Sequence, residues 1–151
     1  MMNDENQSQC PTMCSCLYFT SNKLNRILNK MAEEEFLKTG LSPSHALTLM
    51  NIDFQPGLSQ KELSEIMNIK PSTTTRFIDK LETRGLVERK TKGKSSYLYP
   101  TPKGIDLQVE ISQCWTNLYK RYTKVLGQEK GVELTEIIDK AATKLEENIH
   151  E

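Results

Sequence analysis

The chain has 151 residues, with 20 basic and 20 acidic side chains and 36% hydrophobic residues. This length fits one domain with its own core, and disorder is indicated only for a polar tail at residues 1–12. No apolar run approaches the roughly 20 residues that a membrane span needs, and the first residues lack the basic and apolar regions of a signal peptide. We therefore expect a protein of the bacterial-type cytoplasm with no membrane partner.

Two helices are predicted in the first third of the chain. Apolar residues at helical spacing begin at Leu17 and continue as one long amphipathic helix, which ends before Gly40. A second helix begins with Ser42 as its N-cap and Pro43 in its first turn, where the missing N–H of proline costs nothing. The Gln-Pro-Gly sequence at 55–57 ends it.

Two shorter helices with a tight turn between them follow. Ser59 and Glu62 form a capping box at the start of the first, which is expected to reach Met67. Pro71 starts the second, which ends at Gly85. Two helices this short, joined by about three residues, are typical of a helix-turn-helix.

A β-hairpin is predicted directly after the helix-turn-helix. The segments LVERK and SSYLYP have the composition of strands, and Gly93 in the intervening TKGK supplies the flexibility of a turn. A hairpin in this position is a wing.

Two long helices are predicted to complete the chain. Thr101 and Pro102 start the first, whose apolar stripe continues to Val125, and the second follows Gly127. Such stripes exceed what the small core covers, and a second copy of the chain is the simplest partner for them. The predicted fold is mostly α with a small β-hairpin wing, a winged helix-turn-helix with long terminal dimerisation helices.

The zero net charge hides a basic region. Residues 70–104 contain nine Lys or Arg against three Asp or Glu, so this stretch carries +6 and the rest of the chain −6. Charge segregated in this way provides the local basic patch that phosphate binding requires. The helix that starts at Pro71 therefore has the features of a DNA-recognition helix.

Small hydroxyl side chains occupy the first turns of that helix. Ser72, Thr73 and Thr75 allow close approach to base edges, their hydroxyls can bond bases or phosphates, and threonine methyls can pack on thymine methyls. Arg76 can reach a guanine or a phosphate from the same face. The wing adds Lys92 and Lys94 at its tip. Arg89 and Lys90 lie at its base, where they are expected to raise affinity.

Other interpretations of these residues belong to different classes. A Ser/Thr-rich helix start is also typical of a polar, solvent-facing turn, and some winged helices bind proteins rather than DNA. A winged-helix protein-interaction module without DNA binding is therefore the alternative hypothesis. An enzyme is not expected, because the chain has no phosphate loop, Ser/His/Asp arrangement or paired His/Glu metal motif, and no cofactor is predicted.

The segments LSPSHALTLMNI, LSQKELSEIMNIKPSTTTRFIDKLETRGLVER and TPKG together resemble the MarR family of dimeric winged helix-turn-helix regulators. The likeness covers residues 13–151 as one domain, with dimerisation helices at 13–38 and 101–151 and a DNA-binding lobe at 42–100. The resemblance adds Lys80 to the recognition-helix contacts. The tip TKGKSS is shorter than the family's usual wing with its Asp-x-Arg sequence, and Lys94 stands where that arginine is expected.

The resemblance also implies how such a protein works. A homodimer binds a palindromic operator and reads two half-sites roughly 34 Å apart. It acts as a repressor, which a small molecule or a redox signal releases from the DNA. The family's effector pocket lies between the dimer helices and the lobe. Here the residues that could line it are Phe19, Met50, Trp115, Tyr119 and Tyr122, although an aromatic stripe is also typical of plain core.

Three of the four cysteines, Cys10, Cys14 and Cys16, cluster before the first long helix, and Cys114 lies on a later apolar stripe. Three interpretations remain open: ordinary buried or tail cysteines, a redox switch, and thiolate binding of a soft metal. A thiol near a helix N-terminus ionises more easily, and MCSCLYFTS resembles the peroxide-sensing branch of the family, with Cys14 as the reactive residue. No zinc site is predicted, because no histidine has finger-like spacing.

Overall fold

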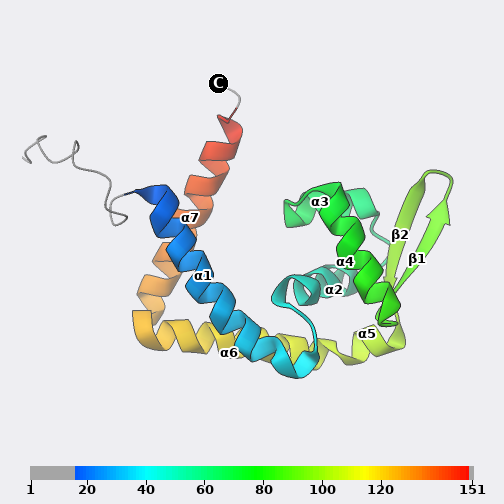
Figure 1. Cartoon of the computed structure of the whole chain (residues 1–151), viewed down its shortest axis with the longest axis horizontal. Coiled ribbons are helices and arrows are strands. Elements are labelled where there is room, and N and C mark those ends of the chain that lie inside the picture. The colour runs from blue at the N-terminus through cyan, green and yellow to red at the C-terminus, as the bar shows by residue number, and fades with distance from the viewer. Residues whose placement is uncertain (1–15, 150–151) are drawn as a thin grey trace, which may run out of the picture.

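The computed structural model describes residues 16–149, and their helices and strands follow the predicted order (Figure 1). The fold is confirmed as mostly helical with a two-stranded antiparallel hairpin. The elements are α1 (Leu17–Phe36), the short 3₁₀ helix η2 (Leu37–Thr39), α2 (Pro43–Phe54), α3 (Gln60–Met67), α4 (Pro71–Thr83), β1 (Val87–Lys92), β2 (Ser95–Pro100), α5 (Pro102–Asp106), α6 (Gln108–Leu126) and α7 (Gln128–Glu147).

Two boundaries differ from the sequence prediction. The helix expected to run unbroken from residue 102 to Val125 is divided at Leu107, because α5 packs beneath the lobe whereas α6 runs along α1. Strand β1 continues to Lys92, which pairs with Ser95, so the hairpin turn contains only Gly93 and the residue after it. The φ of +60° at Gly93 is the left-handed conformation that such a tight turn requires.

The predicted helix starts are confirmed in detail. The Ser42 hydroxyl accepts a hydrogen bond from the His45 amide at 3.2 Å at the start of α2. At α3 the Glu62 carboxylate accepts from the Ser59 amide at 2.6 Å, and the Ser59 hydroxyl accepts from the Glu62 amide at 3.2 Å. The bond from the Ser59 amide lowers the pKa of Glu62. These caps satisfy amides that the first helical turn leaves without partners.

The core of the molecule lies mainly in the lobe formed by α2, α3, α4 and the hairpin. Leu49, Leu63, Ile78 and Leu98 come from these four elements, and each is fully buried. The loop before α3 joins the hairpin edge, since the Leu98 amide donates to the Leu58 carbonyl at 3.0 Å. This pairing fixes the wing to the start of α3.

The TPKG sequence joins the lobe to the long helices. Thr101 donates its amide to the Leu86 carbonyl at 3.1 Å and its hydroxyl to the Gly85 carbonyl at 2.6 Å. A Cβ added to Gly104 would lie 2.1 Å from the Leu86 carbonyl oxygen, so this position has room only for glycine. The motif therefore holds α5 directly against the end of the helix-turn-helix.

The helices α1, α6 and α7 form an arm beside the lobe, and α6 connects α5, below the lobe, to α7 (Figure 1). Arg121 of α6 donates to Glu34 at 2.8 Å and to Glu35 at 2.9 Å, both on α1. The Cys114 thiol donates to the Glu35 carbonyl at 3.2 Å. These contacts and buried side chains such as Ile111 pair α6 with α1.

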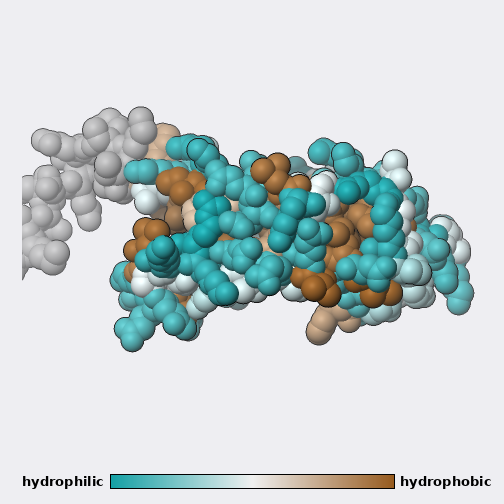
Figure 2. Space-filling view, turned by 90° about the horizontal axis from the view of Figure 1, so that it is seen from below, coloured by the Kyte–Doolittle hydropathy of each residue, from teal (hydrophilic) through white to brown (hydrophobic). Residues whose placement is uncertain are grey.

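Much of the arm's apolar surface is uncovered. Among the described residues of α7, only Gly131 is buried, whereas Ile137, Ile138 and Leu145 are 54%, 49% and 61% exposed. Figure 2 shows hydrophobic side chains reaching the surface at the arm end, on the left, as well as over the lobe. Within residues 16–149, none of the helices combines the length and the apolar composition of a membrane span.

Candidate nucleic-acid interface

Helix α4 has a buried face and a polar exposed face, as expected for a recognition helix. Its buried side chains Thr74, Ile78 and Leu81 face the core, and the Ser64 hydroxyl of α3 donates to that of Thr74 at 2.7 Å. On the other side, Ser72 and Arg76 are exposed. The two hydroxyl residues that flank this exposed strip, at 73 and 75, are half-buried.

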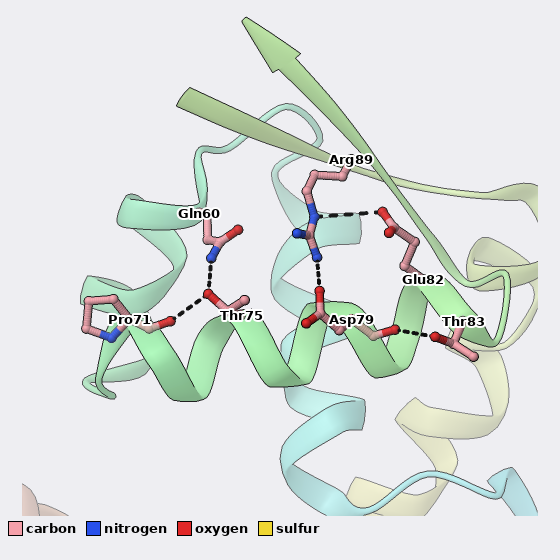
Figure 3. A network of polar contacts seen from close by, with 7 residues as sticks. All are labelled: Gln60, Pro71, Thr75, Asp79, Glu82, Thr83 and Arg89. Atoms are coloured by element: carbon pink, nitrogen blue, oxygen red, sulfur yellow. Dashed lines mark hydrogen bonds and ion pairs between the residues drawn. The ribbon is translucent and has the colours of Figure 1, made fainter. Parts of the chain in front are cut away.

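Thr75 differs from the other hydroxyl residues because its hydroxyl is already bonded within the protein (Figure 3). Gln60, the first residue of α3, donates from Nε2 to Thr75 Oγ1 at 2.5 Å. The Thr75 hydroxyl in turn donates to the Pro71 carbonyl at 3.0 Å. Sequence reasoning missed Gln60, since nothing in its position on α3 indicates which residue of α4 it faces.

Arg89 lies against α4 rather than projecting from the wing. Its guanidinium donates to Asp79, and its Nε lies 3.7 Å from a carboxylate oxygen of Glu82 (Figure 3). The Arg89 side chain is 23% exposed, compared with 57% for Asp79. Arg89 therefore pairs with two carboxylates of α4 and links that helix to the wing, and its contact with DNA stays a prediction.

The lysines of the wing are more accessible. Lys90 lies over the Tyr99 ring with Nζ 4.6 Å from the centroid, and the exposed side chains of Lys92 and Lys94 have no carboxylate partner among residues 16–149. A cleft of about 460 Å³ separates the wing tip from the starts of α3 and α4. It is lined by Ser59, Gln60, Lys61, Ser64, Pro71, Lys94, Ser95 and Ser96.

The basic residues of this region divide into two groups. Arg84 donates to the Gly40 carbonyl, Lys103 donates to the Arg84 carbonyl at 3.0 Å, and Arg89 is held by carboxylates. These three side chains have structural partners. The remaining six, Lys70, Arg76, Lys80, Lys90, Lys92 and Lys94, are exposed on α4, the turn before it and the wing. The accessible positive charge of this region thus lies on α4, the turn before it and the wing.

His45 of α2 packs against the side chain of Phe77 on α4. Its ring centroid lies 4.6 Å from that of Phe77, and its Nδ1 lies 2.5 Å from the Ser42 hydroxyl. Burial lowers the pKa of His45, and the positive charges of Lys80 and Arg84 lower it further. His45 is therefore a packing residue at the edge of the core, in surroundings that disfavour its charged form.

None of the five residues expected at an effector pocket lines the cleft beside the wing tip or the cavity between the end of α6 and the start of α7. Trp115 packs edge-on against Phe36, with centroids 4.6 Å apart, and Met50 packs against the same core. Tyr119 and Tyr122 form an edge-to-face pair at 5.4 Å. Phe19, 47% exposed, contacts the neighbouring tyrosine at the start of α1. The Trp115 indole N–H is buried and has no acceptor in the described part of the chain.

The cysteines are only partly described. Cys10 and Cys14 lie outside residues 16–149, so the structure places neither of them. Cys16 is half-buried at the N-cap of α1, and Cys114 is fully buried. Burial raises the pKa of Cys114, which disfavours a reactive thiolate there. Within the described ranges, no group of His, Cys, Asp or Glu side chains has the arrangement of a metal site.

The geometry defines a winged helix-turn-helix protein whose lobe is joined to a helical arm. Residues 41–94, which make up most of the lobe, match the model of the MarR family. The resemblance predicted from the sequence motifs is thereby confirmed for this part of the chain. The MarR family consists of regulators rather than enzymes.

Two curated relatives share part of the sequence. The HTH-type transcriptional regulator YybA of Bacillus subtilis, itself uncharacterised, is 32% identical over 82 residues, which are 52% of this chain and 55% of YybA. Riboflavin kinase of Thermococcus kodakarensis is 41% identical over 51 residues, 34% of this chain and 24% of the kinase. The chain thus spans about a quarter to about half the length of these relatives.

Solved structures match over nearly the whole fold. CouR from Rhodococcus jostii RHA1, bound to p-coumaroyl-CoA, superposes with a TM-score of 0.76 at 19% identity, covering 88% of this chain and 96% of CouR. A MarR-family regulator from Listeria monocytogenes in complex with a 26mer DNA has a TM-score of 0.74 at 24% identity, covering 88% of this chain and 91% of its own. At these identities the likeness establishes the fold.

Proposed function

We propose that this protein is a transcriptional regulator that binds double-stranded DNA through α4 and the wing. The observation that carries the proposal is the exposed strip of α4, in which Ser72 and Arg76 stand free while the carboxylates of Asp79 and Glu82 are neutralised by Arg89. A helix with this surface suits the major groove, where short hydroxyl side chains and arginine bond base edges. The MarR-family regulator crystallised with DNA supports the same assignment.

The wing contributes affinity in this proposal. Lys92 and Lys94 project from the hairpin tip, which lies beside the start of α4 across the 460 Å³ cleft. Lysines at such a position bind backbone phosphates, whose contacts position a protein without reading sequence. Arg89 acts indirectly, since removing the charge of two carboxylates from the protein surface lowers repulsion of DNA.

We further propose that the protein binds as a homodimer on a palindromic operator. The exposed apolar residues of α7 and of the first turn of α1 provide a surface that a second copy could cover. Two α4 helices related by a two-fold axis would then enter successive major grooves roughly 34 Å apart. A binding site of this kind near the protein's own or a neighbouring promoter would make it a repressor.

The release signal in this proposal is a small molecule that binds near Trp115. Its buried N–H lacks an acceptor in the described residues, and a ligand oxygen would supply one. CouR, with a similar fold, is described in complex with p-coumaroyl-CoA. Trp115 is the single tryptophan of the chain, so its fluorescence reports directly on any compound that binds beside it. Titration with phenolic compounds should change that emission and weaken DNA binding at the same concentrations.

Selection of bound duplexes from a random library, followed by fluorescence anisotropy, tests DNA binding. A dimer that neutralises about 6–10 phosphates should lose roughly three to five orders of magnitude in affinity between 50 and 200 mM salt. Arg76→Ala should weaken binding to the selected site more than to random duplex. Lys94→Ala should weaken both alike and reduce the salt slope by about 2, because each copy in the dimer loses about one phosphate contact. A protein that binds no duplex even at low salt would favour the protein-interaction alternative.

Peroxide sensing by Cys14 remains a separate hypothesis for the same promoter. If Cys14 is the sensor, peroxide should abolish DNA binding by the wild type and leave a Cys14→Ser variant bound. Release of both proteins by peroxide would exclude Cys14 as the sensor.

A further inference from the structure

The hydroxyl of Thr75 has little hydrogen-bonding capacity left for DNA. A threonine hydroxyl offers one proton and two acceptor lone pairs. The proton is directed to the Pro71 carbonyl at 3.0 Å, and one lone pair accepts from Gln60 Nε2 at 2.5 Å. At most one lone pair remains, so Thr75 can no longer act as a donor.

This loss restricts what Thr75 can recognise. In the major groove, thymine presents the O4 acceptor and the C5 methyl group, and guanine presents two acceptors. A side chain without a free donor cannot hydrogen-bond any of these acceptors. On thymine, the feature that Thr75 can still contact is the C5 methyl, through its own Cγ2 methyl. The remaining lone pair could accept only from the amino groups of adenine or cytosine.

Gln60 decides which way Thr75 points. A threonine in a helix divides between two χ1 rotamers, because its hydroxyl can bond a backbone carbonyl of the preceding turn in either. Here α3 supplies a second partner for only one of them, the rotamer in which Oγ1 faces Gln60 (Figure 3). Since Thr75 is half-buried between α3 and the exposed strip of α4, its orientation determines which γ substituent is left for DNA.

We propose that Gln60 is a positioning residue that holds Thr75 in one rotamer, so that Thr75 reads a thymine through its methyl group. The proposal rests on the proposed function, because it requires α4 in the major groove. It gives α3 an influence on sequence specificity, although base contact itself remains with α4.

Deoxyuridine substitution tests the methyl contact directly. Deoxyuridine pairs like thymidine but lacks the C5 methyl, so each thymine of the selected duplex is replaced in turn. Loss of one buried methyl contact should weaken wild-type binding about three- to fivefold at one thymine of each half-site. Thr75→Val, which keeps the branched shape without the hydroxyl, should retain that loss. Thr75→Ser, which keeps the hydroxyl without the methyl, should bind both duplexes equally.

A second pair of variants tests the role of Gln60. Gln60→Ala removes the partner of Oγ1, so the thymine-to-deoxyuridine affinity ratio should fall toward 1. Gln128→Ala is the matched control, because Gln128 also begins a helix but lies on α7 in the arm. It should leave the ratio unchanged. Circular dichroism of each variant confirms that the fold is retained.

The outcomes separate this inference from the proposed function. Wild-type protein that binds the selected duplex but discriminates thymine from deoxyuridine nowhere would overturn the methyl contact and leave DNA binding intact. An unchanged ratio in Gln60→Ala would overturn the positioning role. Failure to bind any duplex would instead refute the proposed function itself.

Discussion

The lobe and the arm are both built from amphipathic helices, yet their apolar faces have different fates. In the lobe, Leu63, Ile78 and Leu98 from three elements are fully buried against one another. In the arm, α7 has an apolar stripe of comparable regularity, but Ile137 and Leu145 are more than half exposed. Periodicity therefore shows that a helix has a face to bury without showing what covers it.

The difference in burial indicates that the lobe and the arm have separate roles. A lobe with a complete core holds α4 and the wing in a fixed relation, as recognition of DNA requires. An arm with an unfinished core depends on another surface, and exposed apolar area of this kind is typical of an oligomer interface. The single chain thus has a fully covered core in the lobe and an uncovered apolar face in the arm.

The junction between the two regions should be the position most sensitive to substitution. Gly104→Ala would place a Cβ 2.1 Å from the Leu86 carbonyl oxygen, and neither backbone can yield without breaking the contacts of TPKG. We expect the free energy of unfolding to fall by about 3 kcal/mol or more. Urea denaturation followed by circular dichroism measures this change.

Gly93→Ala is the matched control for that substitution. Gly93 has a φ of +60° but no heavy atom within 4 Å of an added Cβ, so its cost is conformational strain alone. A loss of about 1 kcal/mol is expected there. Equal losses at the two glycines would show that close packing at the junction is unimportant.

A charge placed on the uncovered stripe of the arm should have the next largest effect. Ile138→Asp would place an unpaired carboxylate from each copy in a dimer interface, at a total cost of about 3 kcal/mol or more, which is roughly a hundredfold in dimer affinity. The lobe should remain folded, because its core does not include α7. Analytical ultracentrifugation measures dissociation, and Thr143→Asp, on the opposite side of α7 by helical spacing, should leave the dimer intact. A monomeric wild type would contradict the dimer proposal.

The sequence was sufficient to predict features that depend on neighbouring residues. Ser42, the Ser59 and Glu62 capping box and Pro71 marked three helix starts correctly, because capping chemistry operates within four residues. Gly93 marked the hairpin turn for the same reason. The division of the last helices at Leu107 was not predictable, since it reflects packing against partners distant in sequence.

In the candidate nucleic-acid interface, too, features set by neighbouring residues were predictable and contacts between distant residues were not. The exposed hydroxyls and lysines of α4 and the wing could be identified from charge and composition. The link from Arg89 to Asp79 joins residues ten positions apart on different elements, and that from Gln60 to Thr75 joins residues fifteen apart. The sequence did contain one signal for the Arg89 link. Asp79 is an acidic residue on the exposed side of a helix rich in basic residues, and such a carboxylate can pair with an arginine of a neighbouring element.

Removal of the Arg89 charge should distinguish a neutralising role from a direct phosphate contact. Arg89→Met leaves Asp79 and Glu82 uncompensated, so DNA affinity should fall about tenfold at low salt as repulsion of the phosphates returns. Stability should change by less than about 1 kcal/mol, since the pair is partly exposed. Anisotropy titrations measure the affinity and urea denaturation the stability.

The companion variant is the triple substitution Arg89→Met, Asp79→Asn and Glu82→Gln. If Arg89 acts only by neutralising carboxylates, removing all three charges should restore most of the lost affinity. A triple variant that binds as weakly as Arg89→Met would indicate that Arg89 contacts DNA itself.

The smallest predicted effect concerns His45, which connects the lobe core to α4. Burial and the neighbouring positive charges lower the pKa of His45 below its ordinary value of 6.5, so the unfolded state takes up a proton more readily than the folded state. The free energy of unfolding should therefore fall as the pH drops below 6.5, by less than about 1 kcal/mol because the ring is partly solvated. Comparing wild type with His45→Gln between pH 7.5 and pH 5.5, a range chosen to lie above the titration of carboxylates near about 4, isolates this contribution. The variant should show a flatter dependence, and parallel curves would mean that His45 titrates alike in both states.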